Sequence, residues 1–491
     1  MTFSAENILL IGSVLLFVSV VASKTSLQFG IPTLLFFLVV GMLAGSDGLG
    51  GIYFNDPKIA QMLGVMALTL ILFSGGLDTK WESTRPVVRT GIALSTLGVL
   101  LTAIFVGLCC YSLLDVPLLE AMLLGAIVSS TDAAAVFSIL RSRRLGLKGN
   151  LRPLLEFESG SNDPMAFFLT TAFIYLISFP DASWTALILK FVVGMSLGAG
   201  AGYVLGRLML WVINHISLDI EGLYSVLLLA FVFFCYSATD AVGGNGFLAV
   251  YVSAIMLGNS NFIHKKSLMK FYDGMAWLMQ IVMFLTLGLL VFPKEIVPVV
   301  PEGLLISAVL IFVARPLAVF ISTMFSSGLS LRKKWFVSWV GLRGASPIVF
   351  ATYPMLAGIA YANTIFNLVF FISVTSVLLQ GALLPWVAKA LHVSVPEKVR
   401  RKFPLDIELK EGFKSELLEI DVAAGSVADG KPVVELEMPK GALIVMINRQ
   451  GKYITASGDT HLEAGDHLLM MADNKMIADE LIAFFGDSKG D

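Results

Sequence analysis

Long apolar runs dominate this 491-residue chain and most constrain its fold. Hydrophobic residues make up 56% of the chain and charged residues only 14%, whereas ordinary soluble domains carry about 25% charged residues. Most of the runs have roughly the 17 to 25 residues that a helix needs to cross a bilayer. We therefore expect an all-α polytopic membrane protein with about 13 transmembrane helices. The expected spans cover residues 7–23, 30–46, 59–77, 90–114, 118–140, 152–179, 184–213, 220–238, 246–258, 274–293, 302–324, 335–357 and 363–391.

Charges in the connections predict the orientation of these spans. Basic residues gather after odd-numbered spans, for example Lys80, Arg85 and Arg89, then Arg141, Arg143, Arg144 and Lys148, and finally Lys398, Arg400, Arg401 and Lys402. Acidic residues follow even-numbered spans, at Asp47, Asp56, Asp115, Asp181 and Asp240. The positive-inside rule then places the N-terminus outside and the C-terminus in the cytoplasm.

An odd number of spans fits two inverted halves of six spans joined by a linker span. The fifth span then corresponds to the twelfth, and both contain a stretch that interrupts a helix, Ser129–Asp132 and Gly341–Pro347. We therefore expect two broken helices that cross at mid-membrane, the usual place of a transporter's ion site.

Three ionisable side chains lie at similar depth in separate spans. Asp132 precedes Arg141 by nine residues, Asp163 follows Arg152 by eleven, and Arg343 follows Lys334 by nine. These separations are roughly 13–17 Å along a helix, about half of the hydrocarbon thickness of about 30 Å. Ionisable groups at that depth normally mark an ion or substrate path.

The sixth span carries the densest polar cluster, Glu158-Ser-Gly-Ser-Asn-Asp-Pro164. Ser159 and Asp163 share one helical face, as do Glu158 and Asn162. Pro164 has no N–H to give to the carbonyl of Gly160, which leaves that oxygen free. A carboxylate, a hydroxyl and free carbonyls are hard ligands that suit an alkali cation or a proton.

Competition at Asp163 predicts the mechanism. Removal from water favours the protonated form of a carboxylate, so Asp163 can hold a proton or help to hold a cation. If only occupied states reorient, cations exchange for protons. One titrating carboxylate beside the neutral Asn162 favours an electroneutral one-to-one exchange, although Asp132 could add a second proton.

Buried charges need partners, and we expect Arg343 to pair with Glu158 and so tie the sixth and twelfth spans together. The alternative is that Arg343 faces a water-filled funnel. Arg315 either has a function or extends toward the cytoplasm. Asp240 and Asn245 are expected in a solvated outer loop.

Beyond residue 395 charged residues return and no further span follows. We expect a transmembrane domain over 1–394, a linker over 395–403 and a small cytoplasmic α+β domain over 404–491. Expected strands cover 417–422, 433–438, 442–447, 452–456 and 468–471, with a hairpin turn at 448–451 and a helix over 474–485.

The motifs Ser130-Thr-Asp132, Glu158–Pro164 and Gly341-Leu-Arg-Gly-Ala345 resemble those of monovalent cation:proton antiporters of the NhaP and sodium/proton exchanger type. The resemblance covers residues 5–392 and implies an NhaA-like fold, a homodimer and elevator-like motion. It implies that Asp163 binds the ion and exchanges the proton, that Thr131, Asp132 and Ser159 complete the site, and that Glu158, Asn162, Pro164 and Arg343 support it.

The tail resembles the TrkA-C (RCK-C) ligand-sensing domain, which implies a nucleotide or another small ligand there and no other cofactor. Two features favour K⁺ over Na⁺. One is the tail itself, and the other is Ser74, which stands at a position where sodium-transporting relatives often carry an acid. The chain thus resembles the potassium/proton antiporters of the cell volume regulation protein A group, in a bacterial inner membrane and without a nucleic-acid partner. The alternatives are a Na⁺/H⁺ antiporter, a gated potassium channel, for which a Thr-Val-Gly-Tyr-Gly-like filter is missing, and a membrane sensor.

Overall fold

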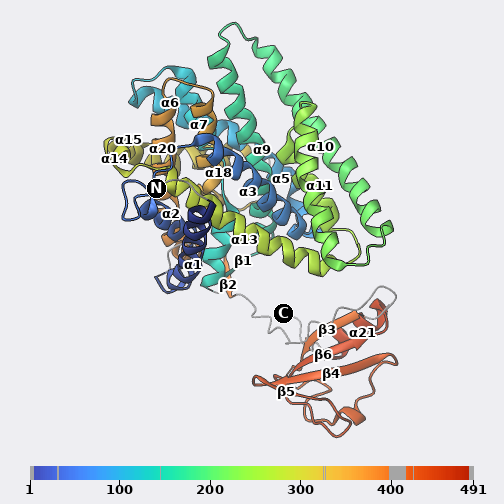
Figure 1. Cartoon of the computed structure of the whole chain (residues 1–491). Coiled ribbons are helices and arrows are strands. Elements are labelled where there is room, and N and C mark those ends of the chain that lie inside the picture. Colours follow the sequence, from blue (N-terminus) through green and yellow to red (C-terminus); the bar gives the residue numbers. More distant parts are fainter. Residues whose placement is uncertain are drawn as a thin grey trace. The chain divides into compact units, whose positions relative to one another are not determined.

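The computed structural model describes residues 5–29, 33–143, 145–324, 326, 328–396, 416–423 and 425–485. The chain divides into two compact units, Met1–Lys398 and Val399–Asp491. Figure 1 shows the first as packed helices and the second as a small sheet with one helix. Most of the expected linker over 395–403, the start of the expected tail domain, Arg144 and the last basic cluster lie outside the described residues.

The helical unit is built from 20 α-helices within the described ranges. They are α1 (Ala5–Phe29), α2 (Thr33–Ala44), α3 (Pro57–Asp78), α4 (Trp81–Thr84), α5 (Val88–Ala93), α6 (Val99–Leu113), α7 (Leu118–Ile127), α8 (Ala133–Ser142), α9 (Leu151–Ser178), α10 (Trp184–His215), α11 (Glu221–Ala241), α12 (Gly246–Gly258), α13 (Lys265–Leu290), α14 (Pro293–Ile296), α15 (Val300–Val309), α16 (Arg315–Ser322), α17 (Leu331–Trp339), α18 (Ala345–Phe350), α19 (Thr352–Leu356) and α20 (Ala362–Ala390). Short 3₁₀ or π turns join some of them into longer rods: Arg85–Val87, Leu94–Gly98, Val297–Val299 and Leu310–Ala314.

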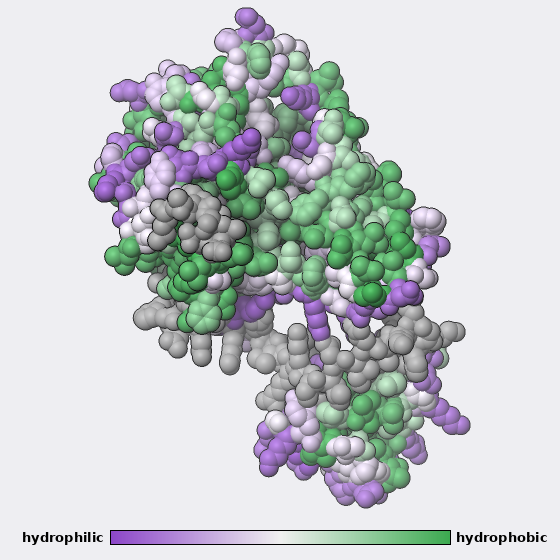
Figure 2. Space-filling model, viewed as in Figure 1, coloured by the Kyte–Doolittle hydropathy of each residue, from purple (hydrophilic) through white to green (hydrophobic). Residues whose placement is uncertain are grey.

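Each expected span coincides with helix, and seven helical rods are long and apolar enough to cross a membrane. Their outer faces carry large exposed hydrophobic side chains, among them Ile188, Val204 and Trp211 of α10. Figure 2 shows such apolar residues spread in green over the helical unit. A bilayer would cover this surface, as composition predicts for a multi-pass membrane protein.

The long helices pack in two sets. In the α12 set, helices α3, α10, α11, α12 and α13 share an apolar core that includes Phe73, Ile213, Cys235, Ala254 and Tyr272. In the α9 set, α9 packs against α5 and α7, α6 against α7, and α20 against α8, α15 and α18. The two sets meet where α9 lies against α12, and where α3 lies against α18 and α19.

Two of the expected spans are interrupted where the sequence predicts. Residues 128–132 separate α7 from α8, and residues 340–344 separate α17 from α18. The breaks touch, because the Asp132 amide donates to the carbonyl of Leu342 at 2.8 Å. This part of the predicted fold, a pair of broken helices that meet, is confirmed.

A two-stranded ribbon closes the helical unit at one end. Strand β1 (Leu145–Leu147), in the loop between α8 and α9, pairs antiparallel with β2 (Ser394–Pro396), which follows α20. The Lys148 amide also donates to the carbonyl of Val393 at 2.8 Å. The chain therefore leaves the helical unit bonded to the loop that joins α8 and α9.

The tail unit is an antiparallel sheet in the order β3-β6-β4-β5, with helix α21. Its elements are β3 (Glu416–Asp421), β4 (Ala442–Arg449), β5 (Lys452–Ile454), β6 (His467–Ala472) and α21 (Lys475–Phe485). Asn448–Gly451 forms the predicted hairpin turn, with Gln450 and Gly451 at positive φ. The predicted strand over 433–438 is wrong, because Val433–Glu435 form a 3₁₀ turn whose first two amides bond the carbonyls of Thr460 and Gly458.

Candidate functional site

The site lies where the two helix breaks meet beside the middle of α9. Residues Ser129–Thr131, which belong to neither helix, precede α8, and Leu342 and Arg343 precede α18. Their backbones are joined by the Asp132–Leu342 hydrogen bond, and the Arg343 amide donates to the Ser376 hydroxyl of α20 at 3.0 Å. Breaking both helices exposes backbone groups that continuous helices would consume, which is how ion sites arise inside membranes.

Arg343 holds the first break. Its guanidinium donates to the carbonyl oxygens of Ser129 and Ser130 at 2.8 and 2.6 Å, and the residue is fully buried. The residue therefore bridges the two breaks directly and neutralises two free carbonyl dipoles. The prediction that Arg343 pairs with Glu158 is wrong.

Glu158 pairs instead with Arg315 at the start of α16. The guanidinium and carboxylate are 2.5 Å apart, and both side chains are 2% exposed. Gly341 lies against this arginine, since a Cβ there would come within 2.8 Å of Nε. From charge and depth alone, either arginine could be the partner of Glu158. The fold places the eleventh span beside α9 and so selects Arg315. Arg315 therefore has a structural role and does not extend toward water.

Asp163 is held by two hydroxyl groups. Ser130 donates to one carboxylate oxygen, and Ser346, in the first turn of α18, donates to the other at 3.0 Å. Asp163 is 7% exposed, and no cationic side chain pairs with it among the residues described. Its charge is therefore available to a mobile cation or a proton.

The remaining predicted α9 residues fasten α9 to the first break. Ser159 donates to the carbonyl of Thr131 and accepts from the amide of Ala133, both at 3.0 Å. Asn162 donates to the Thr131 hydroxyl at 2.5 Å. These bonds fix the break one helical turn from Asp163.

Asp132 has a different environment from Asp163. It is the N-cap of α8, and its Oδ1 accepts from the amides of Ala134 and Ala135 at 2.9 and 3.2 Å. Its other oxygen lies against the α-carbon of Gly344, where a Cβ would overlap it. A helix N-terminus stabilises a carboxylate charge, so Asp132 has its counter-charge within the fold.

Three site residues were not predicted as such. Ser130 and Ser346 lie inside the predicted breaks, and their small hydroxyl side chains next to Thr131 and Pro347 are the only signal the sequence offers. Asn245, expected in a solvated loop, is 8% exposed and donates to the carbonyl of Pro164 at 2.9 Å, whereas Asp240 is exposed as expected. Over the described ranges no three His, Cys, Asp or Glu residues are placed to hold a metal ion together.

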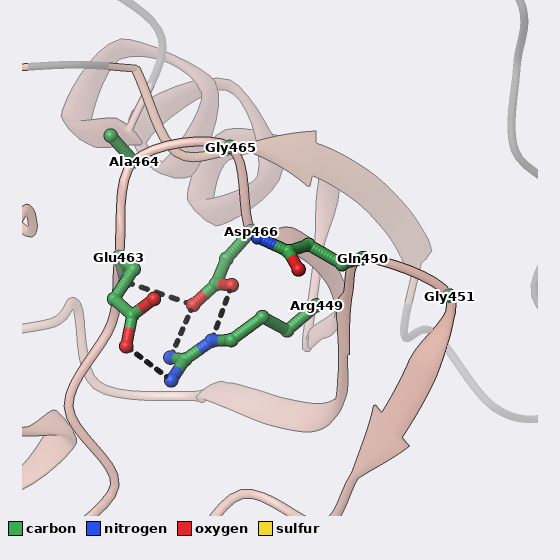
Figure 3. Close-up of a pocket in the computed structure, with 7 residues that line it drawn as sticks. All are labelled: Arg449, Gln450, Gly451, Glu463, Ala464, Gly465 and Asp466. Carbon is green, nitrogen blue, oxygen red and sulfur yellow. Dashed lines mark hydrogen bonds and ion pairs between the residues drawn. The ribbon is translucent and has the colours of Figure 1, made fainter.

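The tail unit contains a hollow of about 550 Å³ between the β4–β5 turn and the loop before β6. Figure 3 shows Arg449 between Glu463 and Asp466 there. Its guanidinium donates to both Asp466 oxygens at 2.9 and 2.8 Å, and to Glu463 and the carbonyl of His461. The hydrogen bonds that Arg449 donates to the Asp466 carboxylate raise the pKa of Arg449, so its charge is already paired within the fold and is not left for an anionic ligand.

Comparison with known proteins finds two sequence families. The profile described as "Sodium/hydrogen exchanger, transmembrane" matches residues 12–390. A second profile, the TrkA-C domain, matches residues 417–486.

Several curated proteins are similar along most of their length. A protein of Shewanella sp. (strain MR-4) named K(+)/H(+) antiporter NhaP2 is 39% identical over 99% of this chain and 86% of its own. The K(+)/H(+) antiporter NhaP of Alkalimonas amylolytica is 38% identical over 95% of this chain and 81% of its own. Among solved structures, the sodium proton antiporter MjNhaP1 of Methanocaldococcus jannaschii at pH 8 has the same fold, with a TM-score of 0.70 over 79% of this chain and 99% of its own at 22% identity.

Proposed function

We propose, because the chain belongs to the sodium/hydrogen exchanger family of cation/proton antiporters, that it carries a potassium ion and a proton in opposite directions across the membrane. The single observation that carries this proposal is the environment of Asp163. Its carboxylate lies at the meeting point of two broken helices, with two neutral hydroxyl donors and no cationic partner among the described side chains.

The chemistry follows from competition for one carboxylate. A bound K⁺ takes oxygen ligands, which Asp163, the Ser130 hydroxyl and the Thr131 carbonyl supply at the first break. When a proton occupies Asp163, the charge that attracts the cation is gone, so the cation leaves. If the empty, charged site does not cross the membrane, each reorientation carries one of the two ions.

The other two carboxylates near the site support a one-to-one, electroneutral exchange. Glu158 is neutralised by Arg315, and Asp132 is stabilised as the N-cap of α8. Of these three carboxylates, Asp163 alone has neither a cationic partner nor helix amides. One titrating group then exchanges one proton for one monovalent cation.

The two helix sets suggest how the site changes sides. The α9 set contains both breaks and Asp163, whereas the α12 set carries none of the predicted ion ligands. We propose an elevator-like movement of the α9 set against the α12 set, with the exposed apolar surface of the α12 set joining two copies in a homodimer. Two observations support potassium. Ser74 is a buried hydroxyl in α3 where an acid would favour sodium, and the two relatives that are 38–39% identical are named K(+)/H(+) antiporters.

The remaining assignments rest on the sequence and the TrkA-C match. We propose a bacterial inner-membrane location with the N-terminus outside and the tail in the cytoplasm, where the tail regulates exchange in response to a small ligand. Efflux of K⁺ coupled to proton entry would then serve potassium, pH and cell-volume homeostasis.

The test is proton flux in inside-out vesicles that hold an acid interior. We expect added K⁺ to collapse the gradient in the wild type and to have no effect in Asp163→Asn, because an amide cannot exchange a proton. Asp181→Asn, an exposed aspartate outside the motifs, is the matched control and should behave as wild type. A response to Na⁺ alone would refute potassium as the substrate, and no response to either ion would refute antiport.

A further inference from the structure

Asn245 joins the ion-carrying helix to the other helix set. Its side-chain amide nitrogen donates to the carbonyl of Pro164, the residue after Asp163, at 2.9 Å. Pro164 belongs to α9, and Asn245 immediately precedes α12. We propose that this hydrogen bond is a latch that holds the α9 set against the α12 set in the state seen here and opens when Asp163 changes sides.

The Asn245 backbone is firmly anchored on the α12 side. Its amide donates to the carbonyl of Gly194 in α10 at 2.9 Å. Gly198, one turn further along α10, allows close packing, since a Cβ there would lie 2.8 Å from the Asn245 carbonyl oxygen. The latch therefore projects from a fixed support.

A second contact accompanies the latch one turn earlier on α9. The ring of Tyr251, in α12, lies so close to Gly160 that any Cβ at that position would overlap it. Gly160 and Pro164 stand on either side of Asn162 and Asp163 in the sequence. The α12 side thus contacts α9 on both sides of the ion-binding residues of α9. A movement of α9 along α12 breaks both contacts.

The two polar atoms of the Asn245 side chain have separate tasks. Its oxygen accepts from the amide of Leu248 at 3.0 Å and caps α12, while its nitrogen forms the latch. Serine caps a helix about as well as asparagine, but its shorter side chain lacks the second donor. Asn245→Ser therefore removes the latch and keeps the cap, whereas Asn245→Ala removes both.

The inference rests on the proposed antiport mechanism, and its test is independent of transport. One spin label is placed at Asp115, between α6 and α7 of the α9 set, and the other at Val242, directly after α11 of the α12 set. The pair reports the distance between the two sets in the full chain. The native cysteines, Cys109, Cys110 and Cys235, are changed to alanine. Both label positions are exposed. We expect two distance populations in the wild type, and in Asn245→Ser a loss of about two- to tenfold in the population that matches this structure, the effect of one hydrogen bond.

Thermal melting separates the latch from a structural role. We expect Asn245→Ser to melt within a few degrees of the wild type and Asn245→Ala to melt lower. An unchanged population ratio in Asn245→Ser overturns the latch, as does a melting temperature as low as that of Asn245→Ala. A wild type that shows no cation-driven proton flux would instead refute the proposed function, whatever the distances show.

Discussion

At the scale of single residues, the helical unit distinguishes the three carboxylates near the helix breaks by giving each a different partner. Glu158 has a full cation in Arg315, Asp132 has helix amides, and Asp163 has only hydroxyl groups. A carboxylate that is already paired within the fold does not need a mobile cation to balance its charge. The difference in partners, not the presence of the acids, singles out Asp163.

The Glu158–Arg315 pair leads to a stability prediction. Arg315→Met alone leaves Glu158 buried without a partner and should lower the free energy of unfolding by about 3–5 kcal/mol. The double change Glu158→Gln and Arg315→Met should cost less than the sum of the single changes. Thermal unfolding of the four proteins in detergent measures this coupling.

The control is Arg152→Ala, which breaks an exposed pair with Glu156 on the same helix. Surface pairs at this spacing contribute about 0.3–0.5 kcal/mol, so the melting temperature should barely change. Strictly additive effects of the Glu158 and Arg315 changes would contradict the buried pair.

Arg449 leads to a prediction for the tail unit. The Asp466 side chain is 1% exposed. Arg449→Ala removes a donor from each of its carboxylate oxygens and leaves only the Glu463 amide, which bonds Oδ2, at a cost of about 1–3 kcal/mol. Amide hydrogen exchange of the full chain should therefore speed up in β4 and β6. Lys452→Ala, at an exposed position of the neighbouring strand, should leave exchange unchanged, and equal effects of the two variants would argue against the cluster.

At the scale of elements, the breaks could be predicted because helix-breaking residues stand out in apolar runs. The spans were equally predictable, since length and hydropathy decide them. The partner of Glu158 could not be predicted, because depth along a helix says nothing about which neighbour it faces. The expected strand over 433–438 failed because Val434 is exposed, so the alternating pattern there did not mark a face of the sheet.

Gly344 tests the contact between the breaks. A Cβ at this position would overlap the Asp132 carboxylate, so Gly344→Ala should push the breaks apart and abolish cation-driven proton flux in vesicles. Gly75→Ala in α3 is the control, because no atom lies within 4 Å of a Cβ there. Alanine favours helix over glycine by about 1 kcal/mol, so this variant should transport normally, and normal transport by Gly344→Ala would contradict the close contact.

At the scale of the whole molecule, the chain combines a unit that holds the predicted ion site with a separate tail unit. The predicted ion ligands all lie before residue 164, and the tail unit has its own core around Leu468, Met470 and Leu481. The division was predictable from composition, because charged residues return where the spans stop. Ion exchange therefore does not need the tail unit, whereas the regulation of that exchange can reside in the tail unit.

Truncation after Pro396 tests this division of labour. The shortened chain keeps β2, so it should fold and still exchange K⁺ for protons at a rate within about threefold of the wild type, a difference of under 1 kcal/mol in barrier. Vesicle proton flux and detergent melting of both proteins make the comparison. Loss of exchange in a truncated chain that melts normally would show that the tail is part of the transport machinery.

The β1–β2 ribbon determines where a pull on the tail is felt. The chain leaves the helical unit at Pro396 with its last three residues bonded to Leu145–Leu147. Tension on the tail is therefore delivered to the loop between α8 and α9, the helices that carry Asp132 and Asp163, and not to the free end of α20. A force applied through the tail therefore acts on the two helices that flank the ion site.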